Sequence, residues 1–130
     1  MSAPDPPVPR TVLVVDDEPF ILKLVRLSLR ELGCQVLEAS DPVEALHIAL
    51  TYPEPIQLVV ADFGLPIING VTLSQRLLAI RPGLRVLHIS GFAQEDLVAA
   101  GFLEPSVPFL AKPWRLDELI DRGADMLGVE

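Results

Sequence analysis

The sequence predicts an α/β fold in which a five-stranded parallel sheet is covered by helices on both faces. Short apolar and β-branched runs alternate five times with segments of helical periodicity along the 130 residues. The run at residues 58–61, Leu-Val-Val-Ala, has no polar alternation, which is typical of a strand buried on both faces. Glycine, proline and asparagine separate these segments, as turns require. Together these observations favour right-handed β-α-β units that share one sheet.

Each expected strand is a short run rich in Val, Leu or Ile that stops at a polar or turn residue. The third of these runs is the most uniformly apolar, so we expect it at the centre of the sheet. The expected strands span residues 11–15, 35–39, 57–61, 84–89 and 107–111.

Each expected helix combines an apolar stripe with a start or stop signal. Pro19 and Pro42 suit the first turns of two helices, and either Ser40 or Asp41 caps the second. Gly33 is expected to end the first helix. The fourth helix has the weakest pattern. The expected helices span residues 19–32, 42–50, 71–80, 94–100 and 115–127.

Length and composition indicate one domain at residues 11–128, preceded by a flexible, proline-rich tail at residues 1–10. Hydrophobic residues make up 50% of the chain and charged residues 22%, which is typical of a globular protein with a sizeable core. The tail contains four prolines and lacks the basic and apolar regions of a secretory signal.

The charge and the cysteine count narrow the class of protein. A net charge of −8 argues against direct binding to nucleic acid or to an anionic membrane surface. The apolar runs are too short to span a membrane. A single cysteine, Cys34, excludes an internal disulfide and a cysteine-based zinc site, and it fits a reducing compartment. We therefore expect a cytoplasmic protein.

Polar side chains follow the expected strands at equivalent places. Asp16 and Asp17 follow the first strand, Asp62 the third, Ser90 the fourth and Lys112 the fifth. For a strand order of 2-1-3-4-5, which is common in doubly wound sheets, these side chains meet at the carboxyl edge of the sheet. Ligands of open α/β sheets bind at that edge.

Three neighbouring carboxylates need a positive charge to remain ionised together. An octahedral cation that prefers oxygen ligands, such as Mg²⁺, meets that need, and Lys112 adds a second positive charge. The set suits the binding of a tetrahedral dianion beside a metal ion, as in phosphoryl transfer. Asp62 lies centrally and is the best candidate for a carboxylate nucleophile that forms an acyl phosphate.

Five motifs in this order resemble the receiver domain of response regulators in bacterial two-component signalling. The resemblance covers about residues 11–128 and implies a flavodoxin-like (βα)5 three-layer sandwich with strand order 2-1-3-4-5. Any one of the motifs is weak, but the full set at strand ends is highly specific. They are Asp16-Asp17, Asp62 with Leu65-Pro66, Gly70, Ser90-Gly91 and Lys112-Pro113.

The resemblance implies a role for each polar position. Asp62 would accept a phosphoryl group from the phosphohistidine of a histidine kinase or a histidine phosphotransfer protein. Asp17 would bind Mg²⁺ directly, Asp16 through water, and Gly64 through its backbone carbonyl, with Asp62 completing the metal ligands. Lys112 would pair with the phosphoryl oxygens. The domain would catalyse its own phosphorylation and dephosphorylation and act on no separate substrate.

The resemblance also implies a conformational switch. Ser90 would hydrogen-bond to the phosphoryl group, and Phe109 would turn inward behind it. The face formed by the fourth helix, fifth strand and fifth helix would then signal to an output partner, to a parent hybrid kinase or to a second copy in a homodimer. No direct contact with nucleic acid or membrane is expected.

Four features depart from the usual pattern of this family. Leu65 stands where Met is common, and Gly64 offers no side chain near the acyl phosphate, which bears on its lifetime. Phe109 replaces the frequent Tyr, and Trp114 stands where Phe is common. The segment 101–106 is longer and more apolar than usual, as in receivers of hybrid kinases.

The residues also leave two other functions to consider. A Mg²⁺-dependent phosphatase or phosphotransferase with an aspartate nucleophile would share the carboxylates and the lysine, but it usually needs a second acid for the leaving group. An interaction module with a degenerate site is the other alternative, and the complete charged set argues against it. A protein kinase is excluded, because Asp62-Phe63-Gly64 occurs without a glycine-rich loop or His-Arg-Asp.

Two histidines and one apolar segment have simpler interpretations. His88 lies inside an apolar strand, where we expect a core side chain that makes its hydrogen bonds rather than a ligand or phosphocarrier. His47 is expected on a helix surface. Phe102 and Leu103 belong either to the core or to an exposed contact.

Overall fold

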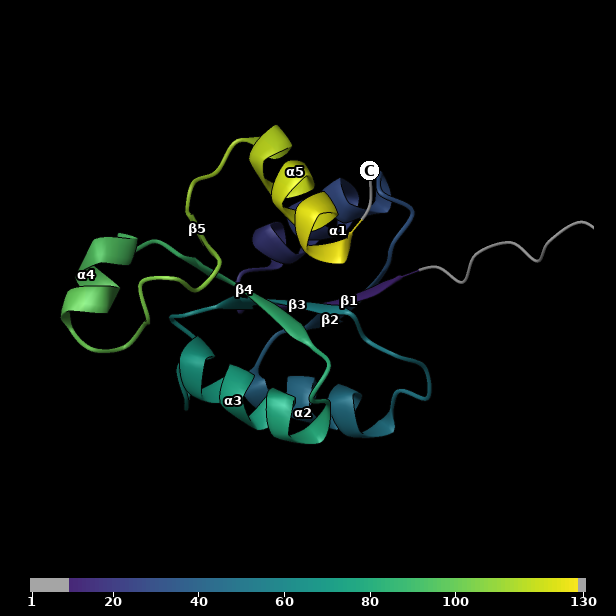
Figure 1. The fold of residues 1–130 in the computed structure, drawn as a ribbon. Coiled ribbons are helices and arrows are strands. Elements are labelled where there is room, and N and C mark those ends of the chain that lie inside the picture. Colours follow the sequence, from purple (N-terminus) through teal and green to yellow (C-terminus); the bar gives the residue numbers. More distant parts are fainter. Residues whose placement is uncertain (1–9, 129–130) are drawn as a thin grey trace, which may run out of the picture.

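The computed structural model describes residues 10–128, and the side chain of Leu116 is left out of the description. Five parallel strands form one sheet in the order β2-β1-β3-β4-β5, which confirms the predicted topology. Each strand is followed by a helix (Figure 1). The elements are β1 Thr11–Val15, α1 Pro19–Arg30, β2 Gln35–Ala39, α2 Pro42–Thr51, β3 Leu58–Asp62, α3 Gly70–Ile80, β4 Arg85–Ser90, α4 Gln94–Ala99, β5 Phe109–Ala111 and α5 Leu116–Leu127.

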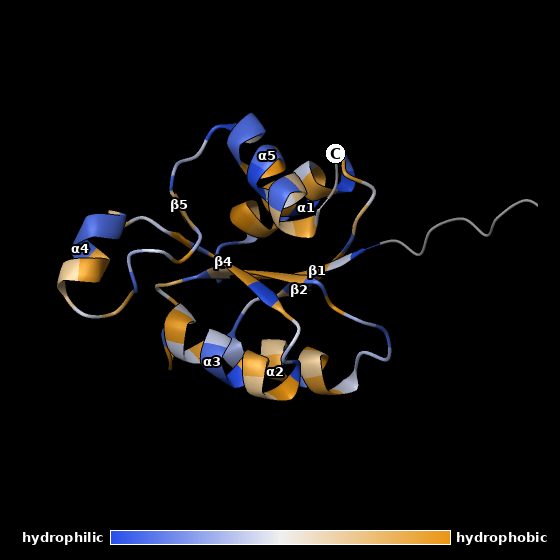
Figure 2. Cartoon of the chain, viewed as in Figure 1, coloured by the Kyte–Doolittle hydropathy of each residue, from blue (hydrophilic) through white to orange (hydrophobic). Residues whose placement is uncertain are grey.

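The helices form two layers, one on each face of the sheet. Helices α1 and α5 cover one face, and α2 and α3 cover the other (Figure 1). Alternate residues of β1 divide between the two cores: Val12 and Val14 pack toward α1 and α5, and Leu13 and Val15 toward α2 and α3. Hydrophobic residues gather on the strands, while α5 turns hydrophilic residues to the outside (Figure 2). A sheet buried on both faces accounts for the continuous apolar runs in its strands.

Helix starts follow the predicted capping signals. The Asp41 side chain accepts a hydrogen bond from the Glu44 backbone N–H at 2.8 Å, so Asp41 rather than Ser40 caps α2. The Glu44 carboxylate bonds to Ser40, at 3.0 Å to the hydroxyl and 3.3 Å to the backbone N–H. Gly33 has a positive φ of 76°, as expected beyond a helix end, although α1 itself already stops at Arg30.

Element bounds differ by two residues at the end of α1 and at the start of β5. We predicted a strand at residues 107–111, but only Phe109–Ala111 pairs with β4, in register with His88–Ser90. Pro108 contributes only its carbonyl, which accepts the backbone N–H of His88 at 3.1 Å. Strands β3 and β4 are displaced by one residue, to Leu58–Asp62 and Arg85–Ser90, so Asp62 and Ser90 are themselves the last strand residues.

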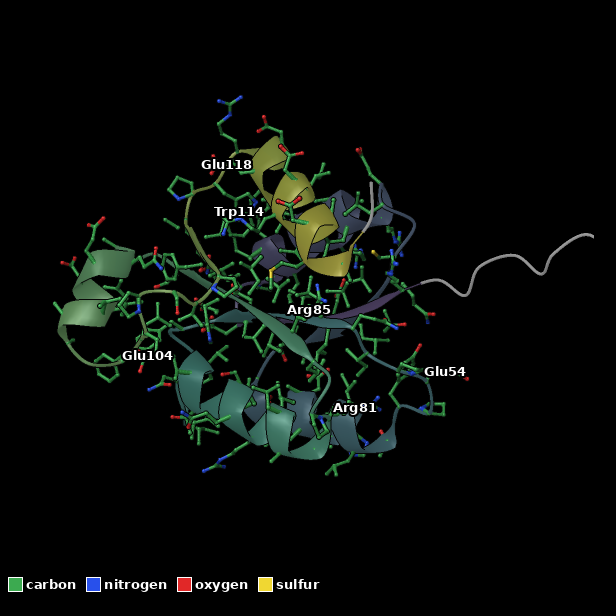
Figure 3. The ribbon with its side chains drawn as sticks, in the orientation of Figure 1. Glu54, Arg81, Arg85, Glu104, Trp114 and Glu118 are labelled. Atoms are coloured by element: carbon green, nitrogen blue, oxygen red, sulfur yellow. The ribbon has the colours of Figure 1, made fainter. Side chains whose placement is uncertain are left out.

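One arginine joins the end of α3 to the end of α2 and the loop after α2, on the side of the molecule opposite the polar cluster. Arg81, at the end of α3, donates to the backbone carbonyls of Ala49 and Glu54 at 2.8 and 2.9 Å, and also to that of Tyr52. Arg81 and Glu54 lie at the same end of the molecule, far from Trp114 and Glu118 at the start of α5 (Figure 3). The predicted tail at residues 1–10 lies almost entirely outside the described residues, which begin at Arg10.

His88 is buried as predicted, with 3% of its surface exposed, but the prediction that it makes its hydrogen bonds is wrong for one nitrogen. Its Nδ1 has no hydrogen-bond partner among residues 10–128. Burial lowers the pKa of His88, because a charged imidazolium is poorly solvated there. The neutral ring is therefore the form that the fold favours. His47 is exposed, and Leu103 is buried while Phe102 is half exposed.

The buried imidazole makes the stability of the fold depend on pH. Unfolded His88 takes up a proton near pH 6.5, whereas folded His88 does so only at lower pH. We therefore expect the contribution of His88 to be fully present above pH 6.5 and to be lost as the pH falls through its folded pKa. Urea unfolding at pH 7.5 and 5.0 checks this: His88→Leu should reduce the loss at pH 5.0, and His47→Leu should not. Equal losses in the two variants would contradict it.

Candidate functional site

The predicted polar residues lie at one edge of the sheet. Asp16 directly follows β1, Asp62 and Ser90 are the last residues of β3 and β4, and Lys112 directly follows β5. Because these strands are parallel and adjacent in the order β1-β3-β4-β5, their carboxyl ends meet. The fold thus brings together side chains from positions 16 to 112 of the sequence.

The Lys112 ammonium group lies close to three carboxylates. Its Nζ donates to Asp16 Oδ2 at 2.8 Å and lies 3.4 Å from Asp62 Oδ1 and 3.4 Å from Glu18 Oε1. The backbone N–H of Lys112 donates to the Ser90 carbonyl at 2.7 Å, which fixes the point at which this side chain leaves β5. Only 14% of the Lys112 side chain is exposed. One cation is therefore shared by several carboxylates, two of which are buried.

The acidic residues form a group that can hold a metal ion. Asp16, Asp17 and Asp62 each offer a carboxylate oxygen, and these oxygens lie within 4.8 Å of one another. Asp16 and Asp62 are buried, whereas Asp17 is exposed, so water can reach one side of the group. An all-oxygen donor set that is open to water on one side fits Mg²⁺, which keeps several water ligands.

The pKa values of Asp16, Asp62 and Lys112 are all raised, so the site holds protons more tightly than free side chains do. Burial raises the pKa of Asp16 despite its hydrogen bond to Lys112. Burial and the nearby charge of Asp16 raise the pKa of Asp62. Burial lowers the pKa of Lys112, but its hydrogen bond to Asp16 and the charge of Asp62 outweigh that effect and raise it overall. The site stabilises added positive charge, which is the electrostatic property of a divalent cation site.

Ser90 and Gly64 lie beside this group. Ser90 is buried, and its Oγ accepts the Phe92 backbone N–H at 3.0 Å, which leaves the hydroxyl proton free for another acceptor. The backbone of Gly64 lies close enough to the Asp62 carboxylate to lower its pKa. A Cβ at Gly64 would lie 3.9 Å from Asp62 Oδ2, so a longer side chain there would reach the carboxylate. The prediction that the Gly64 carbonyl binds a metal ion stays a prediction.

Phe109 is buried on the face that carries α3 and α4. It packs in a cluster with Phe63, Leu97 and Leu103, beside Val107. The inward position predicted for this side chain is therefore compatible with the packing. Whether it moves on phosphorylation stays a prediction.

Sequence reasoning missed two features of the site. Glu18 contacts Lys112, although the sequence marks it only as the third residue of an acidic run. Phe63, next to Asp62, makes edge-on contacts with Phe92 and Phe102, at ring-centroid distances of 6.4 and 5.3 Å. The adjacency of Glu18 to the acidic pair was a usable signal, whereas nothing local to Phe102 indicates the contact with Phe63.

Comparison with known proteins identifies the family. Residues 12–123 match the family model of the response regulator receiver domain. This chain belongs to the response regulator receiver family. The predicted resemblance and the predicted flavodoxin-like (βα)5 fold are thereby confirmed. Among the described residues of this receiver domain, none of the helices is long and apolar enough to cross a bilayer.

Similar curated proteins differ in architecture. The receiver domain is 35% identical over 115 residues to the probable transcriptional regulatory protein TcrX of Mycobacterium tuberculosis, covering 88% of this chain and 48% of TcrX. It is 31% identical to the sensor kinase CckA of Brucella abortus, covering 90% of this chain and 12% of CckA. It is 28% identical to the chemotaxis protein CheY of Treponema pallidum, covering 92% of this chain and 83% of CheY. The chain thus spans only part of the first two proteins.

Solved structures agree with this assignment. The receiver domain of the hybrid histidine kinase CckA is 32% identical, with a TM-score of 0.75, and the match covers 90% of this chain and 98% of that one. A receiver domain protein from Clostridium thermocellum is 26% identical, with a TM-score of 0.78 and coverage of 92% and 94%. The similarity therefore extends over nearly the whole of both receiver folds.

Proposed function

We propose that this receiver domain is a phosphorylatable switch in which Asp62 accepts a phosphoryl group from a histidine kinase or a histidine phosphotransfer protein. The observation that carries the proposal is the convergence of Asp16, Asp17 and Asp62 within 4.8 Å, with the Lys112 ammonium beside them. The receiver domains of two-component systems supply the context in which this set has a phosphoryl-transfer role.

Asp62 is the proposed nucleophile because it is the central carboxylate, at the end of the central strand. A carboxylate oxygen of Asp62 attacks the phosphorus, a new O–P bond forms, and the P–N bond to the donor imidazole breaks. The electron pair of that bond leaves with the imidazole, which takes up a proton. Lys112, 3.4 Å from Asp62, stabilises the negative charge on the phosphoryl oxygens.

Mg²⁺ is the proposed cofactor, held by Asp16, Asp17, Asp62 and the backbone carbonyl of Gly64. When bound, it supplies positive charge that neutralises the transferring phosphoryl group. Asp16 also orients Lys112 through their 2.8 Å hydrogen bond. Water reaches the site on the exposed side of Asp17, which provides the route for hydrolysis of the acyl phosphate.

Ser90 and Phe109 are the proposed switch residues. The free hydroxyl proton of Ser90 is available to a phosphoryl oxygen, and any shift of Ser90 strains the β4–α4 loop through its bond to the Phe92 N–H. Phe109 lies in β5 and pairs in register with His88, two residues before Ser90. Movement at β4 is thereby transmitted to the face formed by α4, β5 and α5.

The proposed domain is residues 11–128, and its output is a changed surface rather than a chemical product. The α4-β5-α5 face is the proposed contact for an output partner, for a parent hybrid kinase or for a second copy of the chain. The sequence similarity to CckA, a sensor kinase, and to CheY, a chemotaxis protein, supports more than one of these arrangements. The proposed location is cytoplasmic, where histidine kinases present their phosphohistidine.

Intact mass after incubation with Mg²⁺ and acetyl phosphate tests the proposal. We expect one phosphoryl adduct that needs Mg²⁺ and is stable to acid but labile to base. Steady release of phosphate that depends on Asp62, without an adduct, would contradict the switch and indicate a phosphatase. If the folded protein shows no adduct and no phosphate release, and histidine kinases do not phosphorylate it either, the proposed switch is wrong. An interaction module then becomes the better account.

Mg²⁺ should stabilise the fold through Asp17. A ligand that binds only the folded state at about 100 times its Kd adds about 2.7 kcal/mol to the free energy of unfolding. Asp17→Asn removes one carboxylate from the proposed ligand set and should lose most of this gain. Differential scanning calorimetry with and without Mg²⁺ measures it. The control is Asp121→Asn on the exposed side of α5, and an equal Mg²⁺ effect in both variants would remove Asp17 from the ligand set.

Lys112→Ala should uncouple phosphorylation from the conformational response. Without the ammonium beside Asp16 and Asp62, the phosphoryl oxygens lose the contact that ties β5 to the site. Aromatic NMR signals of Phe109 should shift on phosphorylation of the wild type and stay unchanged in the variant. Lys23→Ala, at the exposed surface of α1, is the matched control and should respond like the wild type. A normal response in Lys112→Ala would remove this role.

A further inference from the structure

Glu18 contacts Lys112 from outside the group of carboxylates that is proposed to hold Mg²⁺. Its Oε1 lies 3.4 Å from Lys112 Nζ, which is also 2.8 Å from Asp16 Oδ2 and 3.4 Å from Asp62 Oδ1. Asp16 and Asp62 belong to the group together with Asp17, and Glu18 does not. An ammonium has three N–H donors, so each of its three carboxylate neighbours can accept one. Glu18 therefore differs from the other two in not being a proposed metal ligand.

The backbone of Glu18 is fixed, while its side chain takes no part in the helix that it begins. Glu18 is the N-cap of α1, and its backbone N–H donates to Asp16 Oδ1 at 2.9 Å. An N-cap side chain usually accepts a hydrogen bond from the first turn, but among residues 10–128 that of Glu18 makes no such bond. It extends instead to a lysine 94 residues further along the chain. Helix capping therefore does not account for the position of this carboxylate, whereas the contact with Lys112 does.

The surroundings of the Glu18–Lys112 pair offer the ammonium no other carboxylate on this side. Both residues line a pocket whose remaining walls are formed by Phe20, Ile21, Leu24, Pro113 and Trp114. None of these five side chains carries an oxygen or nitrogen that can accept a hydrogen bond. Lys112 is 14% exposed and Glu18 is 61% exposed, so water weakens the attraction between them without removing it.

A divalent cation bound to Asp16 and Asp62 would weaken their attraction for Lys112, because its charge repels the ammonium. Glu18 lies outside the group, so its own attraction for Lys112 is the least affected. We propose that Glu18 is a positioning residue, which keeps the Lys112 ammonium at the site once a divalent cation has bound. This inference rests on the function proposed above, since it assumes that Asp16, Asp17 and Asp62 bind Mg²⁺.

The two lysines of the chain allow a direct test by NMR. Lys23 is exposed on α1 and serves as the internal reference for Lys112. Carbon-13 relaxation at the Cε of each lysine measures how ordered the end of its side chain is. In the wild type we expect Lys112 to stay ordered with and without Mg²⁺. In Glu18→Gln, saturating Mg²⁺ should reduce the order of Lys112 to that of Lys23, whereas without Mg²⁺ the hydrogen bond to Asp16 should still hold it.

The kinetics of phosphorylation by acetyl phosphate give a second readout. With Lys112 less well placed, the limiting rate of Glu18→Gln should fall about five-fold, the upper range for an ion pair with one exposed partner. The KM for acetyl phosphate should not rise, because the variant removes a negative charge that repels this anion. Glu31→Gln, which changes an exposed carboxylate just after α1, is the matched control and should behave like the wild type in both experiments.

The backbone amide of Asp17 separates this inference from the function on which it rests. Mg²⁺-dependent shifts at Asp17 together with an ordered Lys112 in Glu18→Gln would overturn the role of Glu18 and leave the proposed metal site intact. The absence of any Mg²⁺-dependent shift at Asp17 in the wild type would overturn both proposals. Shifts at Asp17 in both proteins, with Lys112 released only in Glu18→Gln, are the result that we expect.

Discussion

Replacing Asp62 by Asn is expected to abolish the Mg²⁺-dependent phosphoryl adduct. The amide keeps the size and much of the hydrogen bonding of the carboxylate, but it lacks the anionic oxygen that attacks phosphorus. It also removes one of the carboxylates that lie within 4.8 Å of one another, so the proposed metal site loses a charged ligand. Both effects act in the same direction, and mass spectrometry after incubation with acetyl phosphate should detect no adduct.

One control variant and one control measurement make this result interpretable. Asp121→Asn changes an exposed carboxylate on α5 and should be phosphorylated like the wild type. Circular dichroism should show that Asp62→Asn is folded, since burial raises the pKa of Asp62 and an uncharged side chain is well tolerated there. Full labelling of Asp62→Asn at another residue would contradict the assignment of the nucleophile.

Gly70→Ala is expected to be the most destabilising single-methyl change near the site. Gly70 begins α3, and its backbone N–H donates to the Phe63 carbonyl at 2.9 Å. A Cβ at Gly70 would overlap the Asp62 carbonyl oxygen and would lie 2.9 Å from the carbonyl carbon of the same residue. Because these atoms belong to backbone, no side-chain rotation relieves the overlap. We expect a loss of about 3 kcal/mol and a decrease of about 10 °C in Tm.

Gly83→Ala is the matched control for this variant. Gly83 lies in the turn before β4, and a Cβ there would meet no atom within 4 Å. Thermal unfolding of both variants should therefore separate the general effect of replacing glycine from the overlap at Asp62. Equal Tm values for Gly70→Ala and Gly83→Ala would show that α3 can move away from Asp62 at little cost. Gly70→Ala should also reduce phosphorylation, because the same overlap displaces the backbone of Asp62.

The positions of Asp16, Asp62 and Lys112 at strand ends were predictable because they depend on local patterns, whereas the order of the strands came from the resemblance to receiver domains. A short apolar run that stops at a polar residue places that residue at a strand end whatever surrounds it. Parallel strands then bring those ends together. The same reasoning predicted that Asp41 or Ser40 begins α2, and the structure selects Asp41.

Features that depend on distant partners were not predictable. Strand β5 is shorter than its sequence pattern because only three of its residues pair with β4. The missing partner of His88 Nδ1 depends on which residues pack around the buried ring, and no local pattern reveals that. The tight fit of Gly70 against Asp62 likewise requires the position of α3 on the sheet. Packing decides these details, whereas periodicity decides which elements form.

The position of the phosphoryl group in the wild type tests the central claim most directly. After incubation with Mg²⁺ and acetyl phosphate, borohydride reduces an acyl phosphate to an alcohol, and peptide mass spectrometry locates the reduced residue. We predict one reduced residue, Asp62. Reduction at Asp16 or Asp17, or phosphate retained on Ser90 or on a histidine, would contradict the account.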